Sequence, residues 1–428
     1  MMPAAQIINE NQNKKVSLPG KPELAFRRVL LETVLLGLLC IAVLEISFTF
    51  AGIGDQEYLK PDRVCGFEIM PDRSIVFRRE GFSRTHFNSQ GMADRERSIA
   101  KSADTYRIAV LGDSIIEALQ VDQKKTMCAL LEGKLNQNLK GKKKIEVLNF
   151  AVGAYNLGQM YLRLKTKVFE FQPDLVLLFV RHHGTYDVIP QPSEPFPKAA
   201  RPYFFVGEGG RLVEDHTVYE QWAKSKSGKR IHNFAWLREH SRIWGAIGKS
   251  LEQAGGFFNS MKAGASKWGA DVTAKQTAFA PTQSDAPSEK LPLAKEAAPA
   301  ASEAPFTQVS NGDNCIRCYY PIVDALIAEM DKESLAHHSE FCVAYMPAHD
   351  SAAELERSLI RRTCSLRHID YLDLGNAFDK AKQESKEALY FVCHFSEHGN
   401  RVLADAIYGG LLTLPGIQRL SLSAEKHR

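Results

Sequence analysis

Short apolar runs alternate with longer stretches of helical periodicity over much of this chain. Runs of this length, apolar throughout and followed by amphipathic segments, are typical of strands buried on both faces. Alternation of the two patterns predicts βαβ units and a parallel sheet covered by helices on both faces. The runs that we expect to form this sheet are Tyr106–Leu111, Ile145–Phe150, Asp174–Val180, Phe341–Met346 and Ile369–Leu374. A helical pattern follows the first run through Leu135.

The segment Val29–Ala51 has a different pattern, nearly unbroken in its apolar character and long enough to cross a bilayer as a helix. Its two acidic residues, Glu32 and Glu45, lie near its ends, where a charge can reach the interface. The rival interpretation is a cleaved signal peptide, but the run is long for one and no small-x-small site follows it. We therefore expect an uncleaved anchor over residues 29–52.

Charges on either side of this segment predict its orientation. The acidic residues Asp55 and Glu57 follow it, and basic residues precede it: Lys14, Lys15, Lys21, Arg27 and Arg28. Under the positive-inside rule, the N-terminus lies in the cytoplasm and everything after residue 52 lies outside.

The pattern divides the whole chain into seven segments. They are a cytoplasmic tail (1–28), the transmembrane anchor (29–52), a β-rich lead-in (55–105), the first part of the α/β domain (106–188), an insertion (189–311), the second part of the domain (312–415) and a tail (416–428). The insertion is expected to hold a strand pair at Tyr203–Val206 and Arg211–Val213 and a helical stretch at Phe234–Met261. Its residues 270–306 are rich in Ala, Pro and Ser, which predicts a disordered linker.

Composition and charge exclude several classes of function. The chain is 44% hydrophobic and 24% charged, ordinary values for a folded protein, and its net charge of +4 gives no reason to expect a nucleic-acid partner. The sequence has no glycine-rich phosphate loop and no dinucleotide fingerprint, so we expect no cofactor. The adjacent pair His337 and His338 lacks helical spacing, so we expect no metal site there.

Cysteine usage fits an extracytoplasmic domain. Of the eight cysteines, Cys40 lies in the apolar segment and the other seven would face an oxidising compartment. Seven is an odd number, so at least one thiol stays free or pairs between chains. The C-x-x-C pair Cys315 and Cys318 has no partners for a zinc site, which leaves a local disulfide or two unpaired thiols.

The sharpest chemical signal is Val110-Leu-Gly-Asp-Ser-Ile-Ile-Glu-Ala-Leu-Gln-Val121. Ser114 here follows the first predicted strand and opens a helix, so its hydroxyl is expected at the edge of the sheet. Backbone amides at the helix N-terminus would stabilise a developing oxyanion. Asp113 in the same turn is expected to brace the loop through backbone hydrogen bonds rather than to act in catalysis.

A second signal lies near the other end of the chain, in His394-Phe-Ser-Glu-His-Gly-Asn-Arg-Val-Leu-Ala404. A histidine in a loop before a C-terminal helix can reach back to the edge of the first strand and act as general base to a serine. The alternative is a helix-capping loop with an incidental histidine. The two signals at opposite ends of one sheet favour the catalytic interpretation.

With these blocks in place, the sequence resembles the bacterial membrane-anchored SGNH (GDSL-type) hydrolases over most of residues 30–188 and 312–415. The matching stretches are Leu111-Gly-Asp-Ser114 with Glu117-Ala-Leu-Gln-Val121, Asn88-Ser-Gln-Gly-Met92 with Asp94-Arg-Glu96, Asn149-Phe-Ala-Val-Gly-Ala-Tyr155, Pro173-Asp-Leu-Val-Leu-Leu178 and His394–Ala404.

The resemblance implies a three-layer α/β/α sandwich and serine-based acyl transfer. Ser114 would be the nucleophile and its own amide would donate to the oxyanion, together with the amide of Gly153 or Ala154. His394 would be the base. The usual substrates in this branch are acyl esters on carbohydrate or cell-envelope glycans, hydrolysed or transesterified. The resemblance also implies the bacterial cytoplasmic membrane as the location.

Two departures from the family pattern affect the site. The third block usually supplies an oxyanion Asn, but Arg181-His-His-Gly-Thr-Tyr-Asp187 contains none, which leaves Thr185, His182 or His183 as substitutes. The family also places an Asp two or three residues before the histidine, where this chain has Val392 and Phe391. The nearest acid upstream is Glu387.

Two hypotheses follow from these observations. The first is a membrane-anchored serine esterase or O-acyltransferase that acts on acyl esters, expected to be acetyl esters, of cell-envelope or exported polysaccharide. The alternative is a degenerate member that keeps the fold and binds a glycan or an envelope-assembly partner. The insertion's Trp222, Trp236 and Trp244 either pack as a small core or line a sugar-binding cleft.

Overall fold

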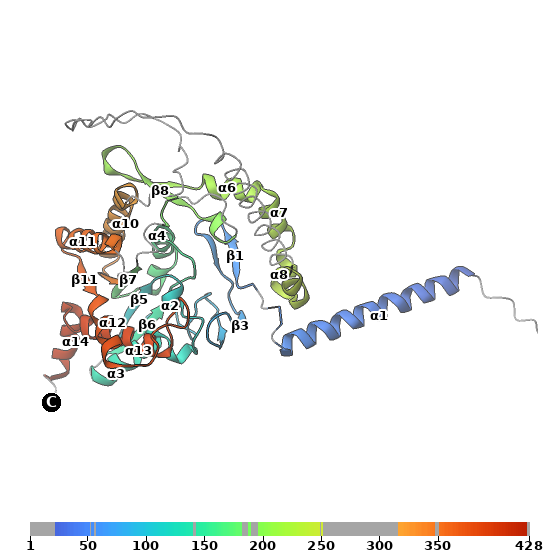
Figure 1. Ribbon diagram of the computed structural model, residues 1–428, viewed down its shortest axis with the longest axis horizontal. Helices are drawn as coiled ribbons and strands as arrows, with labels where there is room; N and C mark the ends of the chain where they lie inside the picture. Colours follow the sequence, from blue (N-terminus) through green and yellow to red (C-terminus); the bar gives the residue numbers. More distant parts are fainter. Residues whose placement is uncertain are drawn as a thin grey trace, which may run out of the picture.

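A five-stranded parallel sheet forms the centre of the computed structural model (Figure 1). The structure describes residues 22–51, 53–54, 57–139, 143–181, 187–189, 196–248, 250, 316–346 and 351–425. The strands of the sheet are β5 (Thr105–Leu111), β6 (Lys144–Asn149), β7 (Leu175–Arg181), β10 (Glu340–Met346) and β11 (Asp370–Asp373). Each overlaps one of the five apolar runs, so the sequence-based prediction of the sheet is confirmed.

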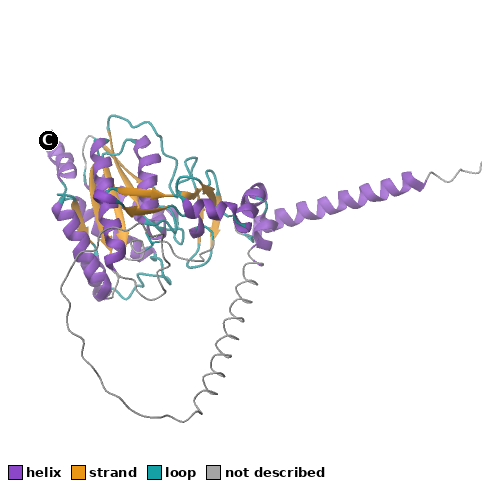
Figure 2. Ribbon diagram, turned by 90° about the horizontal axis from the view of Figure 1, so that it is seen from above, coloured by secondary structure: helices purple, strands orange, loops and turns teal. Residues whose placement is uncertain are grey.

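Helices cover both faces of this sheet, as the continuous burial of its strands requires (Figure 2). Alternate residues of β5 belong to different cores: Ala109 and Leu111 pack on one side, and Ile108 and Val110 on the other. The first core is closed by α4 (Leu157–Thr166), α10 (Ile316–Ala336) and α11 (Ser351–Leu366). The second is closed by α3 (Met127–Asn138), α12 (Gly375–Glu384) and α13 (Glu397–Leu411). The expected three-layer α/β/α sandwich is present.

The strand order places a natural site at one end of the sheet. The order is β11-β10-β7-β5-β6, so the chain moves outward from β5 to β6 in one direction and from β5 to β7 in the other. In open parallel sheets, this reversal opens a crevice at the carboxyl ends of the two central strands. Here that crevice lies after Leu111 of β5 and Arg181 of β7.

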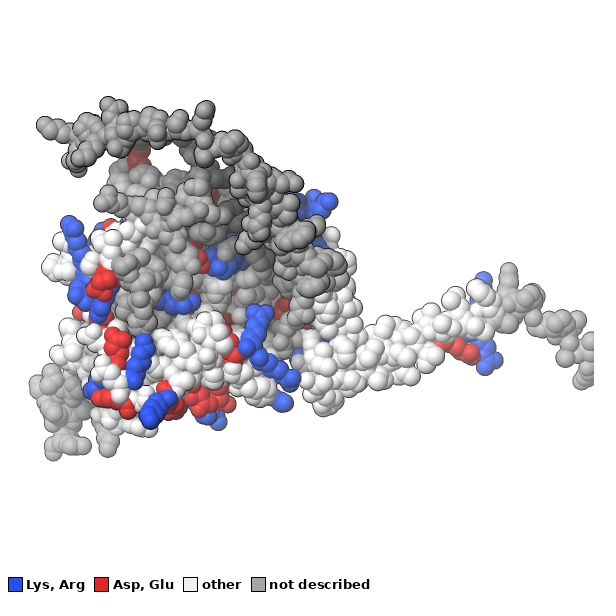
Figure 3. All heavy atoms as spheres, in the orientation of Figure 1, with Lys and Arg blue, Asp and Glu red and all other residues white. Residues whose placement is uncertain are grey.

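Before the sheet, the chain forms one long helix and two small hairpins. Helix α1 (Pro22–Ala51) contains a candidate membrane span, Phe26–Ala51, no part of which is buried by the rest of the chain. Figure 3 shows α1 white over most of its length, with charged side chains near its N-terminal end. The hairpins pair β1 (Leu59–Asp62) with β2 (Gly66–Ile69) and β3 (Ser74–Phe77) with β4 (Ser83–His86), as the β-rich lead-in predicts.

The insertion has the expected strand pair followed by a series of short helices. The pair is β8 (Tyr203–Val206) and β9 (Leu212–Asp215), and the helices include α6 (Thr217–Lys224), α7 (Lys226–Asn233) and α8 (Ala235–His240). Trp222 is buried with Ala200 and Ile231, so it packs as a small core. Trp236 is instead exposed on α8. The predicted linker 270–306 lies outside the described residues.

Three expectations differ in detail from the structure. The helical pattern after the first strand is interrupted, because Ala118 adopts a left-handed conformation (φ 56°) and ends α2 (Ser114–Glu117) after one turn. The predicted helical stretch Phe234–Met261 has a break at Ser241, whose backbone is extended, and residues 251–261 lie outside the described part of the chain. Residues 415–425, most of which were assigned to a tail, form helix α14 (Pro415–Glu425), with Ile417 fully buried.

Six cysteines that the structure describes carry free thiols. Four of them are buried, namely Cys65, Cys128, Cys342 and Cys364, whereas Cys40 and Cys393 are exposed. Cys315 and the side chain of Cys318 fall outside the described residues, so the choice between a disulfide and two thiols stays open there.

Candidate active site

Ser114 stands where strand β5 gives way to α2, at the crevice of the sheet. Asp113 caps this helix, accepting a hydrogen bond from the Ile115 amide at 2.9 Å, and its other carboxylate oxygen accepts one from Arg181. Asp113 therefore braces the loop, as its sequence context predicts. Ser114 is partly exposed although its neighbours are buried, so its hydroxyl is available to a ligand.

His394 reaches the same crevice from the loop before α13. The loop turns tightly, with the amide of Phe391 donating to the carbonyl of His394 at 2.9 Å, and Ser396 caps the helix behind it. The side chain of Gln120 donates to the carbonyl of Phe395 at 2.8 Å. Because Gln120 belongs to the loop after the nucleophile, this bond fixes the histidine loop to the serine loop.

The two predicted catalytic side chains are within hydrogen-bonding distance. His394 Nε2 lies 2.9 Å from Ser114 Oγ, although the residues are 280 positions apart in the chain. His394 Nδ1 lies 2.7 Å from Glu80 Oε1. The three side chains therefore form a continuous serine–histidine–carboxylate chain, in which each contact has the geometry that nucleophile activation requires.

Glu80 is the acid that sequence reasoning missed. It lies at the tip of the β3–β4 hairpin, and one of its carboxylate oxygens accepts hydrogen bonds from the amides of Val392, Cys393 and His394 at 3.2, 2.9 and 3.0 Å. Burial disfavours ionisation, but the hydrogen bonds from Cys393 and His394 outweigh it and hold the pKa of the Glu80 carboxyl well below its usual range. Glu80 thus stays ionised beside the imidazole.

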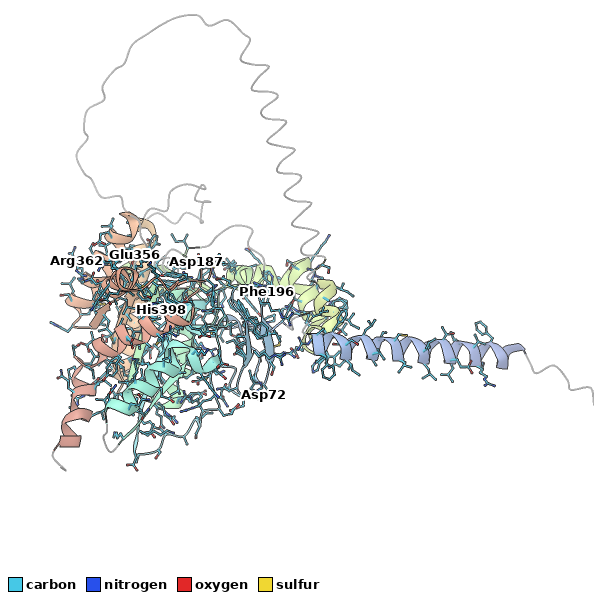
Figure 4. All side chains as sticks on the ribbon, turned by 60° about the horizontal axis from the view of Figure 1, so that its bottom comes forward. Asp72, Asp187, Phe196, Glu356, Arg362 and His398 are labelled. Atoms are coloured by element: carbon cyan, nitrogen blue, oxygen red, sulfur yellow. The ribbon has the colours of Figure 1, made fainter. Side chains whose placement is uncertain are left out.

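Glu387, the nearest acid upstream of His394 in the sequence, has other partners. Its carboxylate pairs with Arg401 at 2.8 Å and lies 3.5 Å from His398 of α13 (Figure 4). Nothing in the residue spacing distinguishes Glu80 from its many acidic neighbours in the lead-in. The orienting acid comes from a hairpin more than 300 positions away, and only the tertiary fold reveals it.

The thiol of Cys393 also contacts the triad. It donates to Glu80 Oε1 at 2.9 Å and lies 3.6 Å from His394 Nδ1. The hydrogen bond to Glu80 raises the pKa of the Cys393 thiol, with burial adding to the effect. Cys393 is therefore a neutral donor to the acid, with its side chain exposed at the mouth of the site.

Candidate oxyanion donors come from two loops. Ser114 is the first residue of α2, so its amide belongs to those that a helix leaves without an intrahelical acceptor. The loop after β6 lies alongside, where the Val152 amide donates to the carbonyl of Gly112 at 3.3 Å. In that loop, Gly153 is buried and its amide interacts with the Glu117 carboxyl, whereas Ala154 is partly exposed with a φ of 66°. Of the two predicted donors, the Gly153 amide therefore already has an acceptor in Glu117.

Glu117 forms a buried polar site directly behind the nucleophile. Burial raises the pKa of this carboxyl to about 8, although hydrogen bonding from the Gly153 amide and the charge of Arg163 lower it. The space above Gly153 is taken by this side chain, since a Cβ at Gly153 would lie 2.5 Å from Glu117 Oε2. Glu117 thus leaves no room for a side chain at position 153.

The third block brings a cation to the site instead of the usual amide. Arg181, the last residue of β7, donates from Nε to Asp113. The guanidinium of Arg181 therefore lies at the serine loop. The pKa of Cys393 is raised by its hydrogen bond to Glu80 and that of Tyr390 by burial, and the charge of Arg181 offsets part of both increases. Residues 182–186, which include Thr185 and both candidate histidines, lie outside the described residues, so their predicted roles stay predictions.

Two groups of described residues have ligand atoms close enough to share a metal ion. One is Glu80, Cys393 and His394, and the other is the exposed set Asp72, His86 and Glu96. In the first group the same atoms already hydrogen-bond one another within the triad. The arrangement as it stands is suited to proton transfer between serine and histidine.

No protein-family model matches the chain, and no curated protein matches it in sequence. Among solved structures, it is similar to a lipolytic protein of the G-D-S-L family from Desulfitobacterium hafniense, at 11% identity over 72% of this chain and 99% of that chain, with a TM-score of 0.34. It is similar to an α/β-hydrolase from the metagenome of Lake Arreo, Spain, at 12% identity over 72% and 96%, with a TM-score of 0.36. A third is a catalytic mutant of the acetylxylan esterase Axe2 from Geobacillus stearothermophilus, at 10% identity over 73% and 96%, with a TM-score of 0.34. Similarity at this level assigns no reaction to this chain. The chemical interpretation of the site rests on the distances between its own side chains.

Proposed function

We propose that this chain is a membrane-anchored serine esterase or O-acyltransferase of the bacterial cell envelope. The observation that carries the proposal is the contact series Ser114–His394–Glu80, with 2.9 and 2.7 Å between successive side chains. The triad restores the acid whose apparent loss favoured a degenerate binding protein. A protein that only binds glycan has no need for this arrangement.

In the proposed reaction, Ser114 Oγ attacks the carbonyl carbon of an acyl ester while His394 Nε2 accepts its proton. Glu80 holds the imidazole in the tautomer that presents Nε2 as acceptor and stabilises the imidazolium that forms. The oxyanion is stabilised by the Ser114 amide, the loop after β6 and the charge of Arg181. His394 returns the proton to the leaving alcohol, and water or a sugar hydroxyl then takes the acyl group from the serine.

The substrate class and the location come from the sequence. The resemblance to envelope hydrolases supports acyl esters, expected to be acetyl esters, on cell-envelope or exported polysaccharide as substrates. The apolar helix α1 and the charges flanking it support a single pass through the cytoplasmic membrane with the N-terminus inside. The α/β domain would then act in the periplasm or outside the cell.

The test is covalent labelling of the full chain in detergent with a fluorophosphonate probe. We expect the parent to be labelled and both Ser114→Ala and His394→Ala to lose labelling, because the probe reports an activated serine. A folded parent that resists the probe would contradict the proposal. Acetyl release from an acetylated glycan, measured with and without a free sugar acceptor, then separates hydrolysis from transfer.

A further inference from the structure

The insertion helices lie at the end of α1 that leaves the proposed membrane. In Figure 1, α8 stands beside the C-terminal end of α1 and α7 lies beyond α8, and both helices run across the axis of α1, as they would if they lay along a bilayer that α1 crosses. The contact is specific. Glu45 of α1 accepts hydrogen bonds from the Ser241 hydroxyl at 3.0 Å and from the amides of Arg242 and Ile243, the latter at 3.2 Å.

Further contacts hold the end of α1 and the segment after it against the insertion and the lead-in. A Cβ at Gly54, just after α1, would overlap the carbonyl of Arg242, so the connecting segment packs directly on the insertion. Arg238 of α8 forms an ion pair with Glu57. Arg78 of the lead-in donates to the carbonyl of Ala51 at 3.3 Å. The insertion is therefore held at the level where α1 would enter the headgroup region.

The exposed surface of the insertion has the chemistry of a membrane interface. Trp236 is 67% exposed, and Phe234 and Ile247 of the insertion are exposed as well. Aromatic side chains of this kind favour the headgroup boundary, where the ring is partly buried and its polar edge stays wet.

Basic side chains accompany these apolar ones. Residues 224–242 contain six Lys and Arg but a single Glu. Four of the basic side chains are exposed around α7: Lys224, Lys226, Lys229 and Arg230. Figure 3 shows blue side chains over this part of the molecule. A short helix with this combination of exposed cations and neighbouring aromatics matches an anionic lipid surface.

We infer that α7 and α8 form a second membrane contact, in which Trp236 and Phe234 enter the headgroup boundary and the cations of α7 bind anionic lipid headgroups. The inference rests on the anchor in the proposed function and goes beyond it. The hairpin that carries Glu80 also contains Arg78, which touches the end of α1. Docking of the insertion therefore fixes the height and orientation of the triad above the bilayer, instead of leaving the domain on a free tether.

The experiment uses the full chain in vesicles that contain phosphatidylglycerol and a lipid with a fluorescence quencher in the headgroup-proximal part of the acyl chain. We expect the lipid to quench part of the tryptophan emission. Trp236→Phe should remove most of this quenchable part, because phenylalanine keeps the apolar contact but has no tryptophan fluorescence. Trp222→Phe is the matched control. Trp222 is 7% exposed, so its loss leaves the quenchable part unchanged.

Removing the net negative charge of the lipid tests the basic side chains. The triple variant Lys226→Gln, Lys229→Gln, Arg230→Gln should reduce quenching in phosphatidylglycerol vesicles more than in phosphatidylcholine vesicles, and added salt should reduce the parent's quenching in the same direction. Parent quenching that Trp236→Phe leaves unchanged would overturn the inference, as would a parent whose emission the lipid does not quench at all. If the lipid does not quench the parent, the exposed surface would instead be expected to bind a protein partner.

Two further readouts separate this inference from the proposed function. Retention of the chain in vesicles after a carbonate wash reports the anchor, and fluorophosphonate labelling reports the triad. A retained, labelled chain with unquenched Trp236 contradicts the second contact alone. Release by carbonate contradicts the anchor and the inference together.

Discussion

Glu117 is a buried acid, one helical turn after Ser114, that is not part of the proposed triad. Its pKa is raised from an ordinary 4.5 to about 8, first by burial, so the carboxyl carries a proton in the folded chain over a range where the unfolded chain has lost it. Between these two values the folded state binds more protons. The free energy of unfolding must therefore fall as pH rises through this range, by up to about 1.4 kcal/mol per pH unit.

Glu117→Gln should remove this pH dependence, because glutamine keeps the shape and does not titrate. We expect the variant to gain stability relative to the parent as pH rises from about 5 to about 8, as measured by denaturant unfolding across that range. The parent–variant difference cancels contributions from other groups. A difference that stays constant with pH would show that Glu117 is ionised throughout.

The residues of the triad differ in how visible they are in the sequence. Ser114 and His394 each follow from a local pattern, a strand-to-helix junction and a loop before a helix. Glu80 has no such pattern, because its role depends on a hairpin that meets the histidine loop only in the folded chain. The sequence lacks the usual Asp before His394 and identifies no acid for the triad, because the contact that identifies Glu80 exists only in the tertiary fold.

At the scale of elements, the tip of the β3–β4 hairpin is held by a close approach. Gly81 has a φ of 68°, and a Cβ there would lie 2.6 Å from the carbonyl oxygen of Gln120 and 2.8 Å from the ring of Phe391. Gln120 follows the nucleophile and Phe391 precedes the base. The missing side chain lets the hairpin enter between the two loops and present Glu80.

Gly81→Ala should displace this tip and lower kcat by roughly tenfold or more, since small misplacements of catalytic groups are costly. The matched control is Gly209→Ala in the β8–β9 turn, where φ is 70° but no atom would meet the added Cβ. Both changes carry the backbone strain of a left-handed alanine, and only the first has the clash. Equal activity of the two variants in an ester-hydrolysis assay would contradict the role given to the hairpin.

Elements of the sheet were predictable because burial on both faces leaves an unmistakable apolar run. All five strands fell within one or two residues of their predicted limits, since the pattern records burial directly. The break at Ala118 was not predictable, because Leu119 and Gln120 look helical but are held by the lead-in and the histidine loop. Local periodicity cannot register such long-range bonds.

At the scale of the whole molecule, the proposed topology places the entire α/β domain on one side of a membrane. Cys393 is exposed at the mouth of the site, whereas the other described cysteines of the domain are buried. A membrane-impermeant maleimide should therefore label Cys393 in intact spheroplasts, and Cys393→Ser should lose that share of the label. Cys393-dependent labelling that appears only after lysis would place the domain in the cytoplasm.

The proposed site depends most on Glu80 as the acid of the triad, so the most direct measurement compares Glu80→Gln with Glu387→Gln in kcat for ester hydrolysis. Loss of the orienting carboxylate should lower kcat roughly ten-thousandfold, because the imidazole then favours the wrong tautomer. The Glu387→Gln variant should keep a kcat close to that of the parent, because Glu387 pairs with Arg401 on the surface. Near-parental turnover in Glu80→Gln, with the loss found instead in Glu387→Gln, would contradict the site described for this chain.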